Sequence, residues 1–144
     1  TVPGTTARVA LPLMIEIDSN VLLRLLTADD ARQHEMAVAF FKERSPASPA
    51  FVSVMTLAEM VWVLRRRYGL SKEEIGSSLR QILDSDDFVV EALESVEFIR
   101  REGADPNQLG DYLVAHLCKK AGCERTVTFD RQAANSVPGM ELLA

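Results

Sequence analysis

Four acidic residues stand out by their places in the chain: Asp18, Glu59, Asp111 and Asp130. Asp18 and Asp130 each close a short, largely apolar run, and Glu59 and Asp111 interrupt apolar patterns with helical spacing. An ionised carboxylate beside an apolar core is costly unless a positive charge compensates it. A divalent cation shared by the four groups would supply that charge, because Mg²⁺ and Mn²⁺ prefer oxygen ligands. The pattern therefore favours metal-assisted phosphodiester chemistry.

Each acid also has an ordinary structural explanation, and the local sequence leaves most of these open. Asp18 and Asp130 can cap the helices that follow them, since Asp is a favoured N-cap residue. Glu59 fits an S/T-x-x-E capping box at the first turn of its helix. Asp111 is different, because its expected helix starts at Pro106 and places it beyond the first turn among apolar neighbours. Only for Asp111 does the local pattern favour the functional explanation.

The elements that must position these acids alternate between strands and helices. We expect strands at 14–17, 51–54, 88–90, 125–128 and 140–142, and helices at 19–27, 29–44, 56–68, 71–83, 93–101 and 106–121. This order predicts an α/β fold, a single domain with a mainly parallel central sheet of 4–5 strands and helices on both faces. Ligands of such sheets bind at the carboxyl ends of the strands, so we expect the four acids to converge there.

Length and composition agree with one globular domain. The chain has 144 residues and a net charge of −5, which argues against non-specific coating of nucleic acid by a broad basic surface. Two cysteines without a cluster of further ligands predict neither a zinc site nor a disulfide framework. No stretch is apolar for the roughly 20 residues of a membrane span. We expect a cytoplasmic protein with its domain at 14–144, preceded by a disordered leader or artificial remnant at 1–13.

Four segments, taken together and in order, resemble the PIN-domain ribonucleases. They read IDSNVLLRLL, VSVMTLAEMVWVL, LGDYLVAHLCKKAG and TVTFDRQAA, and each carries one of the four acids. The nearest resemblance is to the VapC-like toxins of bacterial toxin–antitoxin pairs, and it covers the chain from Met14 onward. No single segment is specific, because short motifs of this kind are common by chance; their order and spacing carry the resemblance.

The resemblance implies a site and a set of partners. The implied metal-binding and catalytic residues are Asp18, Glu59, Asp111 and Asp130, holding Mg²⁺ or Mn²⁺, with Asn20 and Thr128 orienting the carboxylates. It also implies an endoribonuclease that inhibits translation by cleaving RNA, a cognate antitoxin that neutralises it, and a homodimer. Arg24, Arg66 and Arg131 lie near the acids in sequence and are candidate RNA contacts, although solvated arginines explain them equally well.

Three other functions compete with this interpretation. A housekeeping PIN-type RNA-processing nuclease would use the same site, and a non-catalytic PIN module that binds protein would not need all four acids. A phosphoaspartyl enzyme or receiver domain also places Asp at strand ends with Mg²⁺. The phosphatase pattern requires D-x-D after the first strand, whereas this chain has Asp18-Ser19-Asn20, which disfavours that class.

Overall fold

A computed structural model describes residues 13–143 of the chain. Its elements follow in the order β1 (Ile15–Glu16), α1 (Ser19–Leu26), α2 (Ala31–Lys42), β2 (Ala50–Val52), α3 (Val54–Arg66), α4 (Lys72–Leu83), β3 (Phe88–Val90), α5 (Leu93–Arg101), the 3₁₀ turn η1 (Pro106–Gln108), α6 (Leu109–Lys120), β4 (Thr126–Thr128), α7 (Arg131–Ser136) and β5 (Met140–Leu142). The predicted α/β class and the alternation of strands with helices or helix pairs are confirmed.

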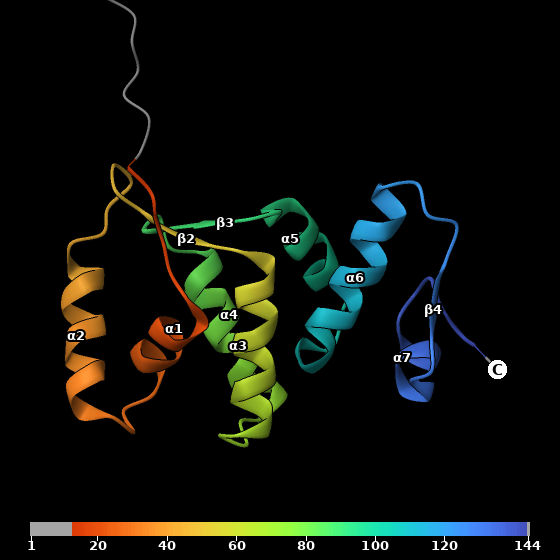
Figure 1. The fold of residues 1–144 in the computed structure, drawn as a ribbon, viewed down its shortest axis with the longest axis horizontal. Coiled ribbons are helices and arrows are strands. Elements are labelled where there is room, and N and C mark those ends of the chain that lie inside the picture. Colours follow the sequence, from red (N-terminus) through yellow and green to blue (C-terminus); the bar gives the residue numbers. More distant parts are fainter. Residues whose placement is uncertain (1–12, 144) are drawn as a thin grey trace, which may run out of the picture.

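The strands are parallel, as predicted, but they form two sheets instead of one. One sheet has the order β1-β2-β3, with Ile15 paired to Ala50 and Ala50 to Phe88. The other consists of β4 and β5, with Thr126 paired to Met140. In Figure 1, α3 and α6 stand between α1 on one side and β4 with α7 on the other.

Apolar packing also divides the described residues into two clusters. The larger cluster is centred on α3, whose Leu57, Met60, Val61 and Leu64 are all buried at helical spacing. Helix α3 packs against α1, α4 and α6, so it joins the N-terminal sheet to the rest of the domain. A smaller cluster holds the C-terminal sheet, where residues of α6, α7 and β5 meet around Tyr112.

Helix boundaries differ from the predicted ones where a cap decides them. Ser53 caps α3 by accepting a hydrogen bond from the N–H of Thr56, so the helix begins at Val54 and not at Thr56. The capping box of Ser71 and Glu74 is present as predicted.

The segment from residue 106 to 120 is divided between two elements. Asp105 caps the short turn η1, and α6 proper begins only at Leu109. The expected leader at 1–13 falls on residues outside the described range, except for Leu13. The N–H of Leu13 donates to the carbonyl of Ala47 at 3.1 Å, so this residue already lies beside the loop before β2. Among the described residues, no helix has the length and apolar character needed to cross a membrane.

Leu57→Ala tests whether α3 organises the main core. Leu57 is 0% exposed, so we expect the free energy of unfolding to fall by about 2–5 kcal/mol. Met55→Ala on the same helix is the matched control, because Met55 is 79% exposed and its loss should cost under about 0.5 kcal/mol. Denaturant unfolding measures both, and equal losses in the two variants would contradict the assignment.

Candidate active site

Asp18 lies two residues after the end of β1 and caps α1. Its Oδ1 accepts hydrogen bonds from the Ser19 hydroxyl at 3.1 Å and from the N–H of Asn20 at 3.4 Å. The cap explanation for Asp18 is therefore correct. Capping leaves part of the carboxylate available, because Oδ2 has no hydrogen bond among the described residues and the residue is exposed.

Asp130 repeats this construction at the second sheet. It lies two residues after the end of β4 and caps α7, with its Oδ1 accepting from the N–H of Ala133 at 3.0 Å. Thr128 Oγ1 in turn accepts from the N–H of Asp130 at 3.0 Å, which holds the turn in place. The Thr128 side chain thus holds the backbone of Asp130. This contact is compatible with the role of orienting the carboxylates that the resemblance implies for Thr128.

Glu59 is not the capping-box residue that the local sequence allowed. Because α3 begins at Val54, Glu59 is its sixth residue, and the box would need a helix that starts after Thr56. Its side chain is exposed and makes no hydrogen bond among the described residues. The correction removes the main structural explanation for Glu59.

Asp111 is the one candidate acid that is partly buried. It belongs to the first turn of α6, because that helix begins at Leu109, so the prediction that it lies beyond the first turn was wrong. Within the described residues its carboxylate has no hydrogen-bond partner. Burial raises the pKa of Asp111 above its ordinary value, and the negative charge of Asp130 raises it further. The two acids are therefore near enough for their charges to interact.

The four acids do not converge within the described chain. Helices α3 and α6 pack closely where Ala58 faces Gly110, which brings the helix of Glu59 beside that of Asp111. Figure 1 places α1, which begins after Asp18, and α7, which begins after Asp130, on opposite sides of these two helices. In residues 13–143, no three His, Cys, Asp or Glu side chains are grouped closely enough to hold a metal ion.

The expectation that solvation could not explain these acids needs a correction. Asp18, Glu59 and Asp130 are exposed, and water stabilises an exposed carboxylate without help from a cation. The argument from desolvation survives only for Asp111, whose burial raises its pKa.

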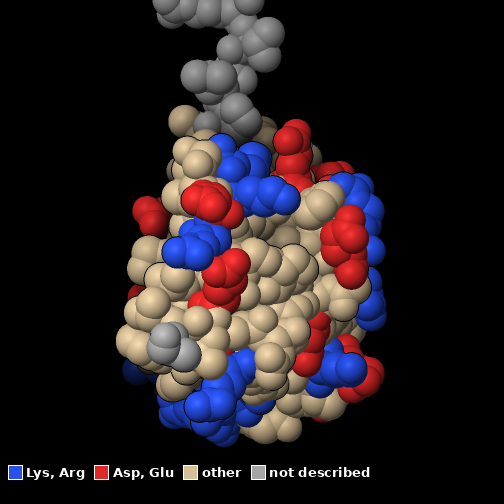
Figure 2. All heavy atoms as spheres, turned by 90° about the vertical axis from the view of Figure 1, so that its right-hand side faces the viewer, with Lys and Arg blue, Asp and Glu red and all other residues tan. Residues whose placement is uncertain are grey.

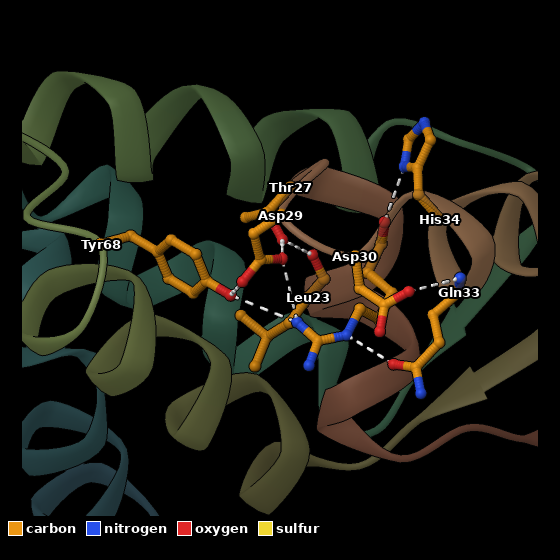
Figure 3. A network of polar contacts seen from close by, with 8 residues as sticks. Leu23, Thr27, Asp29, Asp30, Gln33, His34 and Tyr68 are labelled. Atoms are coloured by element: carbon orange, nitrogen blue, oxygen red, sulfur yellow. Dashed lines mark hydrogen bonds and ion pairs between the residues drawn. The ribbon is translucent and has the colours of Figure 1, made fainter.

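The guanidinium of Arg24 is held by hydrogen bonds within the protein. Its guanidinium donates to Asp29 at 3.1 Å, to Gln33 at 2.7 Å and to the Tyr68 hydroxyl at 3.3 Å, and Figure 3 shows the surrounding network. The Tyr68 hydroxyl also donates to Asp29 at 2.7 Å, and this bond is the main cause that lowers the pKa of Asp29. The network ties α1 and the start of α2 to the residues that follow α3.

The other expected polar residues are free to meet a ligand. Arg66, in the last turn of α3, and Arg131, at the start of α7, are exposed and form no ion pair among the described residues. Asn20 is the second residue of α1, and its exposed side chain lines a groove together with Asp18. Of the three arginines, Arg66 and Arg131 remain candidates for RNA contacts.

The sequence did not predict that groove. It has a volume of about 590 Å³, runs along β1 and is bounded by α1 and by Gln33, Met36 and Phe40 of α2. The groove is lined by residues of β1, α1 and α2, and it forms only because α2 packs on α1.

Titration of Asp111 tests the link between the two acids of the C-terminal part. We expect its pKa to lie above that of an ordinary aspartate, and Asp130→Asn to lower it part of the way, because burial is the larger cause. A raised pKa means that the folded protein loses stability as the pH rises from the ordinary carboxyl range to the raised pKa. Carboxyl-detected NMR measures the titration, and an unchanged pKa in Asp130→Asn would refute the coupling.

Comparison with known proteins adds a finding that covers the whole site. The model of the PIN domain family matches residues 15–137, a stretch that includes the four acids, Asn20 and Thr128. No curated protein matches the chain. A PIN domain points to nuclease function, because these domains are generally metal-dependent nucleases. Since the match spans well over half of the sequence, the chain belongs to the PIN domain family.

Proposed function

We propose that this PIN domain is an endoribonuclease that depends on Mg²⁺ or Mn²⁺ and uses Asp18, Glu59, Asp111 and Asp130 as its metal ligands. The observation that carries the proposal is the carboxylate of Asp111, which is partly buried, lacks a hydrogen bond among the described residues and stands near a second acid. Fold stability alone gives no reason for such a group. The family match over all four acids supports the same assignment.

The donor set suits a hard cation in its chemistry. All four side chains offer oxygen, and Mg²⁺ is commonly bound by one or two carboxylates while substrate phosphate and water complete its shell. Asp111 and Asp130 fit this requirement as a pair, whereas the full set of four is not assembled in the described chain. A bound ion would supply the positive charge that lets these carboxylates approach one another and a phosphodiester.

Polar and basic residues beside the acids have their own roles in this proposal. Ser19 and Thr128 hold the turns at Asp18 and Asp130, so the two carboxylates are kept at the N-termini of their helices. We assign Asn20 to orienting Asp18, beside which it lies in the groove. Arg66 and Arg131 would meet the phosphates of RNA, each contributing mainly a charge that salt screens.

We further propose that the nuclease is the toxin of a toxin–antitoxin pair, acts in the cytoplasm as a homodimer, and inhibits translation. The resemblance of its four segments to VapC-like toxins supports this role, together with a groove of a size that admits a segment of an antitoxin. A housekeeping RNA-processing nuclease is the alternative with the same chemistry. The four retained acids argue against a purely protein-binding module.

Cleavage of RNA with Mg²⁺ or Mn²⁺ tests the metal site. We expect Asp18→Asn and Asp111→Asn each to reduce cleavage by roughly 100-fold or more, above the usual effect of losing an outer-shell partner, and a chelator to abolish it. Asp105→Asn is the matched control, because Asp105 only caps η1 by accepting from the N–H of Asn107 at 2.9 Å. Wild-type activity in both site variants would refute the ligand assignment.

Expression in a bacterial host separates a toxin from a housekeeping nuclease. A toxin should arrest growth when it is induced, Asp111→Asn should not, and a gene encoded directly beside it should relieve the arrest when co-expressed. Growth curves with immunoblots at equal protein levels measure this. Unimpaired growth with an active wild-type enzyme would support the housekeeping alternative.

A further inference from the structure

The chain has two cysteines, and both lie at the C-terminal end of α6. Cys118 belongs to the last turn of this helix, and Cys123 lies three residues after its end at Lys120. Both thiols are free. Neither side chain belongs to an apolar cluster of the described residues, so core packing gives no reason for either cysteine. Their common place at one helix end calls for another explanation.

A glycine ends the helix between the two cysteines. Gly122 has a φ of +100°, in the left-handed region that glycine adopts without steric cost. Its N–H donates to the carbonyl of Lys119 at 3.0 Å, and the N–H of Cys123 donates to the carbonyl of Cys118 at 2.9 Å. A left-handed residue with these two bonds defines the Schellman motif. The longer-range bond of this motif therefore joins the two cysteines.

This hydrogen bond limits the distance between the two cysteines. With an N···O distance of 2.9 Å and standard backbone dimensions, the Cα atoms of Cys118 and Cys123 are at most about 6.8 Å apart, and less because the path between them bends. Disulfides join Cα atoms that are about 4.4–6.8 Å apart. The Schellman motif also commonly packs the side chains at these two positions against each other. The turn therefore meets the distance requirement of a disulfide as it stands.

The turn is open to solvent. Residues 119–125 are all exposed, and Cys118 is half-buried. The end of α6 and the turn before β4 stand at the upper right of Figure 1, and Figure 2 looks at the molecule from this side. Basic and acidic side chains stand next to one another near the top of the face in Figure 2. Cys123 also lines a cavity of about 540 Å³, so a small molecule can reach its thiol.

Two other roles fit the cysteine pair less well. Within residues 13–143, no three His, Cys, Asp or Glu side chains are grouped closely enough to hold a metal ion, so the pair lacks further ligands. Charged residues are depleted from the centres of protein interfaces. The turn is rich in exposed charged residues, which are Lys119, Lys120, Glu124 and Arg125. Its composition therefore favours contact with water and small solutes.

We propose that Cys118 and Cys123 are a redox modification site, whose thiols form a reversible disulfide across the end of α6 by exchange with a small-molecule disulfide such as oxidised glutathione. In the cytoplasm, the location proposed above, disulfides are usually transient and redox-sensing. A bond of this kind differs from a structural framework, because the chain folds with both thiols free. The modification site does not depend on the proposed nuclease function.

The exchange takes place in two steps. The thiolate of the exposed Cys123 attacks one sulfur of the small disulfide, whose S–S bond breaks and releases one small thiolate. The thiolate of Cys118 then attacks the Cys123 sulfur, the mixed S–S bond breaks, and the second small thiolate leaves. The two protein thiols are oxidised to one disulfide and the small disulfide is reduced to two thiols. The protons of the protein thiols pass to the two leaving groups.

The disulfide fastens the connection between the elements of two acids. Asp111 lies on α6, and Asp130 follows β4, so the turn joins the segments that carry both. Exposed backbone hydrogen bonds hold the turn when the thiols are free, and helix ends of this kind open locally with ease. A bond across the turn restrains that opening. We therefore expect the amides of Gly122 and Cys123 to exchange their hydrogens at least roughly tenfold more slowly in the oxidised protein.

Peptide mapping after equilibration with glutathione tests the site. The full chain is held at fixed ratios of oxidised to reduced glutathione, free thiols are alkylated, and the protein is digested with trypsin without reduction. Trypsin cuts after Lys119 and Lys120, between the two cysteines. The disulfide then appears as peptide 121–125 linked to the peptide that contains Cys118, with two hydrogens lost. The wild type should convert to this form as the ratio rises and revert when reduced glutathione is restored.

Three variants separate the geometry of the turn from chance proximity. Cys118→Ser removes the second thiol, so Cys123 should keep its glutathione adduct, and Cys123→Ser should give no linked peptides. Gly122→Ala is the matched control for the backbone, because a Cβ at this position meets nothing within 4 Å and only the left-handed conformation opposes it. We expect Gly122→Ala to lower the equilibrium constant for closing the disulfide by roughly 5–30-fold. Circular dichroism verifies that the variants fold.

Three results of the mapping would overturn the proposal. In the first, both wild-type thiols stay free or carry separate glutathione adducts at every ratio. In the second, the cysteines link two chains, which a non-reducing gel detects. In the third, Gly122→Ala closes the disulfide as readily as the wild type. Hydrogen exchange at Gly122 and Cys123 that is the same in the oxidised and reduced proteins would refute the restraint at the end of α6.

Discussion

The apolar packing of helix α3 is the interaction on which the other elements depend. Its buried face, from Leu57 to Leu64, contacts α1, α4 and α6, so it sets the positions of the helices that carry Asp18 and Asp111. Glu59 lies on the same helix with its side chain exposed, which places one candidate ligand on a helix whose other face is buried in the core. A site that is built on a packed helix keeps its geometry better than one built on a loop.

Electrostatics acts against this packing at the site. Four carboxylates repel one another when they approach, by about 4 kcal/mol for a pair at 4 Å in an effective dielectric of 20. The described chain keeps three of the four acids in water and brings together only Asp111 and Asp130, where the pKa of Asp111 already rises. Gathering all four acids therefore needs a positive charge that offsets this repulsion.

Two of the acids stand just beyond the ends of strands. Within residues 13–143, β1 lies in a sheet of three strands and β4 in a sheet of two, and a helix-capping aspartate stands two residues after each of these strands.

Local patterns in the sequence were sufficient for the fold class and for most elements. Strand segments, helix periods and the capping box of Ser71 and Glu74 follow from interactions within a few residues, which the sequence displays directly. The same holds for the capping roles that were open for Asp18 and Asp130. Boundaries were less accurate where two caps competed, as with Ser53 and Thr56 before α3, because only the packed helix selects between them.

Tertiary structure alone decided which acids meet. The division into two sheets, the burial of Asp111, the capture of Arg24 by Asp29 and Tyr68, and the groove along β1 all join segments far apart in the chain. Such contacts depend on how whole helices pack, and no local spacing encodes the distance between two strand ends. The sequence by itself determined that the chain is a parallel α/β protein with an acid after two of its strands. Tertiary packing determined that Asp111 is partly buried and lies near Asp130, because these two residues belong to elements that meet only in the folded chain.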